Sequence, residues 1–276
     1  MLSQPMEKLN QAPAYLRETL LFSYQEGEQF CLNLYQEGGF RRVDQAFKEL
    51  PASTEQILHP EKYLEKNDPP IEISLDQLPP LSGKRIGNNV AGELGIQLLL
   101  SDQLQNERAR LASEGWGGDR YLVYRTAPGK HAIVWVTQWD TEVDARQFLQ
   151  AYTEYYVKKH HLVPVEDADK SAAVMFSFAG RQQTFTRRDK SVVILDVENA
   201  DEAEKLLQSL WQKPPEKPAL SGPSSPPALT NAAPAGPTLA PTNAPLPAAT
   251  NAVPRPPQTN AAPAPAPTPA PKPKSP

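Results

Sequence analysis

The chain has 276 residues, and its prolines are distributed so unevenly that length alone gives a misleading domain count. Of its 31 prolines, 21 lie between Pro214 and Pro276, a segment without Phe, Trp or Tyr. Such a segment cannot bury enough apolar surface to offset the conformational entropy lost on folding. We therefore predict a disordered Pro/Ala/Thr-rich tail at 214–276, after a folded part of about 213 residues.

The charge argues against nucleic acid as a partner. The formal net charge is −4, and the tail contains four Lys or Arg residues and one Glu, so the folded part carries −7. Binding to a phosphate backbone needs a positively charged surface. No run of about 18 apolar residues and no signal peptide is present, so we expect neither a membrane segment nor an export signal in these residues.

Cysteine is equally restrictive. Cys31 is the only one, which excludes an intrachain disulfide and a thiolate metal cluster within the chain. It follows Phe30 and precedes Leu34 in an apolar helical pattern, so we expect it to be buried as a small hydrophobic residue.

The first 65 residues are predicted to be helical. Apolar residues recur at helical spacing from Pro13 to Gly38, with Gly27 interrupting them, which indicates one kinked helix or two consecutive ones. The pattern continues over 40–50. Ser53 to Gln56 then have the spacing of a capping box, so a short helix should follow and end near His59.

Residues 66–83 form the predicted boundary. They contain Pro69-Pro70 and Pro79-Pro80 around an alternating segment at 71–75. Proline cannot sit inside a paired ladder, so the sequence predicts either a short edge strand or an extended connector here.

Residues 84–213 alternate between strand-like and helix-like patterns. Hairpins predominate in this order, and we predict an α+β domain with a mostly antiparallel sheet and helices packed on it. The predicted strands are 84–90, 120–125, 131–139, 173–178, 183–187 and 192–197, and the predicted helices are 93–114, 141–159 and 200–211.

The chain contains no self-contained catalytic motif. None of its histidines begins a His-Glu-x-x-His sequence, and neither phosphate-binding glycine loops nor a Gly-x-Ser-x-Gly motif occurs. The sequence therefore predicts no catalytic residue, no metal ligand and no cofactor. His160 and His161 end a predicted helix, where cationic side chains favourably complement the helix dipole.

A glycine-rich stretch at 115–121 offers a possible ligand site. Glycines allow close approach of a ligand to the backbone, and Trp116 could stack on a flat group, with Asp119 and Arg120 beside it. Alternatively, Gly115 ends the preceding helix and residues 117–119 turn into the next strand.

Two further positions have two interpretations each. His59, in the loop after the capped helix and close to Glu61, is a candidate base or ligand, or it bonds to local backbone. The carboxylates Asp140, Glu142 and Asp144 suggest a cation site, or they cap the next helix with Asp140 as N-cap.

Several segments together carry a family resemblance. They are Phe22–Gly27, Leu34–Phe40 with Val43-Asp44, Ser53–Tyr63, Gly115–Tyr121, and Trp139-Asp140 with Asp144-Ala145 and Phe148. In this order they are similar to the C-terminal region of a bacterial family of zinc metallopeptidase-like proteins. The resemblance implies an upstream His-Glu-x-x-His helix and a further glutamate that hold zinc, none of which occurs here.

The resemblance leaves two functional hypotheses. In the first, the chain is a non-catalytic metallopeptidase-like region that lacks hydrolytic activity itself and contributes to a substrate cleft for a peptide or protein. In the second, it is a stand-alone ligand-binding or scaffold module tethered by the proline-rich tail. The resemblance implies an extracytoplasmic or membrane-associated protein, whereas a true start at Met1 implies a cytoplasmic one.

Overall fold

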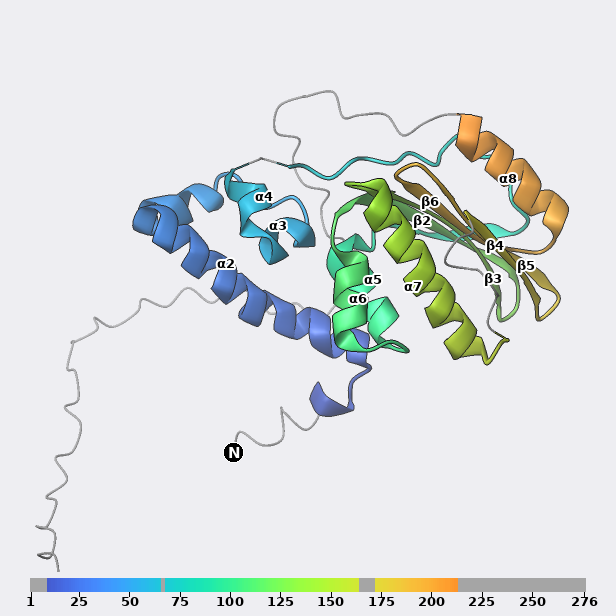
Figure 1. The fold of residues 1–276 in the computed structure, drawn as a ribbon, viewed down its shortest axis with the longest axis horizontal. Helices are drawn as coiled ribbons and strands as arrows, with labels where there is room; N and C mark the ends of the chain where they lie inside the picture. The colour runs from blue at the N-terminus through green and yellow to red at the C-terminus, as the bar shows by residue number, and fades with distance from the viewer. Residues whose placement is uncertain (1–8, 66–67, 164–171, 213–276) are drawn as a thin grey trace, which may run out of the picture. The chain divides into compact units, whose positions relative to one another are not determined.

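The computed structural model describes residues 9–65, 68–163 and 172–212 (Figure 1). All of them fall in the first of the chain's two compact units, Met1–Pro226. The second unit, Pro227–Pro276, and the whole predicted disordered tail lie outside the described residues.

The N-terminal helical region consists of α2 (Ala14–Ala46), α3 (Thr54–Leu58) and α4 (Pro60–Leu64). The interruption predicted at Gly27 is wrong, because the helix runs through that residue. The helix is instead broken at Gly38-Gly39, where the apolar pattern that starts at Pro13 ends and Gly39 has a φ of 64° that favours glycine. The helical region has its own small apolar core. This core contains Phe30, Leu34 and Ala46, packed against Val43, Ile57, Tyr63 and Leu64.

The expected burial of Cys31 is wrong, because its side chain is exposed. Successive residues of a helix point about 100° apart. Phe30 and Leu34, four residues apart, face the core of the helical region, and Cys31 therefore points away from it.

The cap of α3 follows the sequence prediction in part. The Gln56 amide donates to Ser53 Oγ at 3.2 Å, as a capping box requires. The Gln56 side chain, however, accepts from the Ala52 amide at 2.7 Å instead of the Ser53 amide.

The rest of the described chain confirms the predicted α+β class. Every strand pairing is antiparallel, and the six-stranded sheet has the order β1-β2-β3-β6-β5-β4. The strands are β1 (Lys84–Asn89), β2 (Trp116–Ala127), β3 (Lys130–Trp139), β4 (Ala173–Phe178), β5 (Arg181–Arg188) and β6 (Ser191–Val197).

Within the residues that the structure describes, four helices accompany this sheet: α5 (Gly92–Ser101), α6 (Asn106–Ser113), α7 (Glu142–His160) and α8 (Ala200–Gln212). The single helix predicted over 93–114 is wrong, because the chain turns between α5 and α6. This turn brings Leu104 into the core at 6% exposure, and α6 packs back against α5.

The two faces of the sheet have separate apolar cores. Side chains alternate across a strand, so Val192 and Ile194 of β6 join one core and Val193 and Leu195 the other. Helices α5, α6 and α7 contribute to the first core, and α8 to the second. Figure 1 shows α7 and α8 against the sheet.

The proline-rich segment before β1 helps to cover the second face. Ile73, Leu75 and Leu81 are buried there, and the Ile71 amide donates to the Gly117 carbonyl at 2.7 Å. Residues 71–75 join no strand ladder, so of the two predicted alternatives the connector, and not the edge strand, is the one present. Among the described residues, no helix is long and apolar enough to cross a membrane.

Candidate functional site

Asp119 is the centre of a buried hydrogen-bond network in the sheet region. Its side chain accepts from the backbone amides of Ala91 and Gly92, the first at 2.9 and 3.1 Å and the second at 2.9 Å. It also accepts from the indole nitrogens of Trp116, at 3.0 Å, and Trp135, at 2.9 Å. Burial raises the pKa of Asp119 against the opposing effect of these hydrogen bonds. The residue joins β2 to β3 and to the start of α5.

Trp116 has no ring surface available for stacking on a ligand. It is 2% exposed and lies in the core between the sheet and α5 to α7. Arg120 also makes structural contacts, since its Nε donates to the Ile73 carbonyl at 3.3 Å. The structure therefore joins two of the four predicted site residues, Trp116 and Asp119, in a buried network, and Arg120 makes separate contacts with Ile73 and Asn88.

Close contacts with neighbouring atoms explain why two positions of this stretch, Gly115 and Gly118, are glycine. Gly115 has a φ of 75°, and a Cβ there would meet the Asp144 carboxylate. A Cβ at Gly118 would overlap the Ile71 carbonyl oxygen. The close approach is to the protein's own backbone and not to a ligand. The predicted helix end at Gly115 is confirmed, whereas residues 117–119 lie within β2 instead of a turn.

A second group of charged and titratable residues, two of them buried, lies where the helical region contacts the sheet region. We call it the junction cluster, and it consists of Glu55, His59, Lys62, Glu93 and Asp140. Glu55 and Glu93 are each 1% exposed. Such burial of carboxylates is rare unless they are paired.

Lys62 of α4 is the only permanent cation among these five residues. Its Nζ lies 2.5 Å from Glu55 Oε1 and 2.5 Å from Asp140 Oδ2, and 3.5 Å from Asp68 Oδ2. It thereby links α3 and α4 to the residue that follows β3. Burial of the ammonium lowers its pKa, but the hydrogen bonds to Asp140 and Glu55 prevail and raise it.

His59 forms the second link across the junction. Its Nε2 lies 2.9 Å from Oε1 of Glu93, in the first turn of α5, and its Nδ1 lies 3.8 Å from Glu61. The His59 side chain thus contacts a residue 34 positions away along the chain, whereas one of its two interpretations was a bond to local backbone. Glu93 Oε2 is buried without a hydrogen-bond partner.

The protonation of these groups differs from that of exposed residues. Burial raises the pKa of Glu55 to about 7, although the Lys62 ammonium acts to lower it. The hydrogen bond to Glu93 raises the pKa of His59, and burial raises that of Glu93. All three changes favour the protonated form of the group concerned.

The predicted N-cap of α7 is wrong by one residue. Thr141 is the N-cap and forms a complete capping box with Asp144. Asp140 is instead directed to Lys62, and its amide donates to the Gly115 carbonyl at 2.8 Å. Either residue type caps helices well, so the sequence alone did not distinguish them.

The histidine at the end of α7 takes part in aromatic packing. His160 packs against Tyr156 and Phe178, with ring centroids 4.3 and 4.9 Å apart. Within 9–65, 68–163 and 172–212, no group of three or more His, Cys, Asp or Glu side chains is placed to hold a metal ion.

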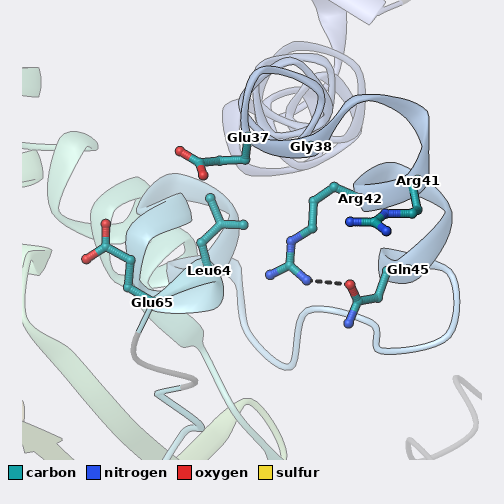
Figure 2. Close-up of a pocket in the computed structure, with 7 residues that line it drawn as sticks. All are labelled: Glu37, Gly38, Arg41, Arg42, Gln45, Leu64 and Glu65. Carbon is teal, nitrogen blue, oxygen red and sulfur yellow. Dashed lines mark hydrogen bonds between the residues drawn. The ribbon is translucent and has the colours of Figure 1, made fainter.

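A polar pocket of about 240 Å³ lies beside the kink of α2. Figure 2 shows the side chains of Arg41, Arg42, Glu37 and Glu65 around it, with Arg42 donating to Gln45 at 2.7 Å. Charges of both signs line this pocket, so it selects neither an anion nor a cation.

Sequence reasoning missed Glu55, Lys62 and Glu93 as members of one cluster. A usable signal existed in part, because Glu55, His59 and Lys62 are spaced at i, i+4 and i+7, which places them on one side of a helical segment. The partner Glu93 is the only charged residue within helix α5, and no pattern links it to His59.

We compared the chain with known families, curated proteins and solved structures. A family model described as "Domain of unknown function (DUF8575)" matches residues 78–207. The match includes the complete sheet, Asp119, Glu93 and Asp140, and it leaves out α2, α3 and α4. The comparisons with curated proteins and with solved structures gave no match.

Proposed function

We propose that the chain is a non-catalytic region of a zinc metallopeptidase-like protein, without hydrolytic activity of its own. In this proposal, helix α2 packs against the preceding, zinc-binding part of the same protein. The observation that carries the proposal is the apolar surface that α2 leaves exposed.

This surface is large and regularly spaced. Leu16, Leu20 and Tyr24 recur every four residues and are more than half exposed, with Tyr24 at 76%. Beyond the kink, Phe40 and Phe47 are exposed to a similar degree. Large exposed apolar surfaces of this kind mark contacts with other polypeptide. Phe30 and Leu34 are already used in the core of the helical region, so the exposed residues are a separate surface.

We assign the exposed apolar surface of α2 to a contact with a preceding segment because of the order of the chain and because of the resemblance. Helix α2 is the first long element of the described chain, and the resemblance places a zinc-binding part before it. The resembling segments around His59, Gly115 and Asp140 make contacts between elements of the fold. These contacts favour a structural role for the segments over a catalytic one.

A peptidase assay tests the absence of activity. The full chain, incubated with zinc and an unfolded protein substrate, should release no fragments above the background of a chelator-treated sample. Cleavage that zinc supports and a chelator abolishes would disprove a non-catalytic role.

The packing role of α2 is tested in the genome and then in the longer protein. The DNA preceding the Met1 codon should encode an in-frame His-Glu-x-x-His motif. In that longer protein, Leu20→Glu should weaken packing and lower peptidase activity, whereas Gln25→Glu, which adds a charge to an exposed polar position, should not. A ribosome-binding site directly before Met1, without the upstream motif, would contradict this proposal.

The alternative of a stand-alone binding module loses its main support. It relied on Trp116 as a stacking surface, and this side chain is buried. The tail that would tether such a module lies outside the described residues. We therefore propose only the first function.

A further inference from the structure

We infer that the junction cluster is a proton-operated latch, which holds the helical region on the sheet region when protons are bound at Glu55 and at the His59–Glu93 pair, and loosens when they are lost. The inference is independent of the proposed function. It rests on where the apolar cores end and on which contacts cross the junction.

The apolar cores do not continue across the junction. The core of the helical region draws all its members from residues between Phe30 and Leu64. Neither core of the sheet region includes a residue of α2, α3 or α4. Helices α2 and α3 nevertheless contact α5. Polar contacts therefore have a larger share in holding these two regions together than they have within either one.

Three described polar links cross the junction between α3–α4 and the sheet region. They are His59 to Glu93 at 2.9 Å, Lys62 to Asp140 at 2.5 Å, and the Leu94 amide donating to Thr54 Oγ1 at 3.3 Å. The first depends directly on a histidine and a buried carboxyl. The second shares its lysine with the buried carboxyl of Glu55.

The cluster has an excess of acid when every carboxyl is ionised. Glu55 faces Lys62, Asp140 and Glu93. Glu93 faces His59, Lys62 and Glu114, and His59 faces Glu93, Glu61 and Glu55. Lys62 alone cannot neutralise all of these carboxylates, and Asp68 adds another at 3.5 Å. Bound protons remove part of this repulsion and part of the cost of burying charge.

The direction of the pH effect follows from proton linkage. The pKa values of Glu55, His59 and Glu93 are all raised in the folded protein, that of Glu55 to about 7. The closed junction thus binds more protons than the opened one. Because of this difference, the free energy that favours the closed form falls as pH rises. For Glu55, the stabilisation is complete below its ordinary pKa of 4.5 and is lost as pH rises through about 7. Mild acid closes the latch, and mild alkali loosens it.

Hydrogen exchange of the full chain tests the latch. After correction for the intrinsic pH dependence of exchange, protection of the α3 and α4 amides should fall at least about tenfold between about pH 5.5 and about pH 8.5. Protection in β6, which lies in the sheet core, should change much less. Equal protection of α3 and α4 at both pH values, or protection that rises with pH, would overturn the inference.

A matched pair of variants tests whether Glu55 causes the fall in protection. Glu55→Gln keeps the size and an acceptor for Lys62 but cannot titrate, so it should reduce the fall in protection by several fold. Glu107→Gln, at an exposed position of α6, should leave the fall unchanged. Should Glu55→Gln fail to fold, His59→Gln provides the second test, because it removes the other titrating link. A fall that stays at its original size in whichever variant folds would contradict the assignment.

Discussion

Asp119 and Glu93 are two buried carboxylates near the start of α5, and they are held in different ways. Asp119 is 2% exposed and accepts hydrogen bonds from two backbone amides and two indoles, none of which titrates near neutral pH. Glu93 is 1% exposed, contacts the titratable His59, and has one oxygen without a partner. The sheet region is thus fixed by permanent donors, whereas the junction depends on protonation.

The largest expected effect is at the permanently bonded carboxylate. Asp119→Asn keeps the shape of the side chain but turns an NH2 group toward donors that need an acceptor. We expect the free energy of unfolding to fall by about 4 kcal/mol, measured by urea denaturation. Asp189→Asn, at an exposed turn with φ 51°, is the control and should change it by less than about 0.5 kcal/mol.

The junction should respond to loss of its cation in a pH-dependent way. Lys62→Met leaves Glu55 and Asp140 without their shared partner, and we expect a loss of about 3 kcal/mol at about pH 8. At about pH 5.5 the loss should be smaller, because Glu55 can then take up a proton. Denaturation curves at both pH values measure this difference. An equal loss at both would show that Glu55 does not respond to proton binding as described.

A smaller effect separates the two neighbouring residues at the start of α7. Thr141→Ala removes the capping hydroxyl and should cost about 1 kcal/mol at any pH between 5 and 9 or so. Asp140→Asn weakens a link to Lys62 instead, so its cost should vary with pH. A pH-independent cost for Asp140→Asn together with no cost for Thr141→Ala would mean that the cap is Asp140 after all.

The smallest effect is expected on the exposed face of α2. Tyr24→Ala removes a ring that is 76% exposed in this chain and should change the free energy of unfolding by less than about 0.5 kcal/mol. By contrast, Phe148→Ala in the sheet core, where the ring contacts Trp135 and Trp139, should cost about 4 kcal/mol. A large loss with Tyr24→Ala would mean that this surface is already covered within the chain.

Local patterns predicted most of the sheet region. The six predicted strands and the predicted helices at 141–159 and 200–211 rest on patterns among neighbouring residues, and all of them are present in the described chain. The break between α5 and α6 was missed because it depends on burying Leu104, which only the packed fold reveals.

The site could not be predicted from the sequence because its contacts join residues that are far apart along the chain. His59 and Glu93 are 34 residues apart, and Lys62 and Asp140 are 78 apart, so no spacing rule connects them. The glycines at 115–118 were equally ambiguous, because a glycine needed for contact with Ile71 resembles one needed for a ligand. Local signals thus identified His59 and Asp119 as residues of interest, but not Glu55, Lys62 or Glu93, whose contacts appear only in the folded chain.

The protonation of Glu55 tests the central claim most directly. Carbon-13 NMR of the full chain, with side-chain carboxyl groups of glutamate labelled, follows each carboxyl as pH changes, and Glu55→Gln identifies the signal. Our account predicts that Glu55 titrates at about 7. A Glu55 signal that titrates at the ordinary value of 4.5 would show that the junction is not held by bound protons.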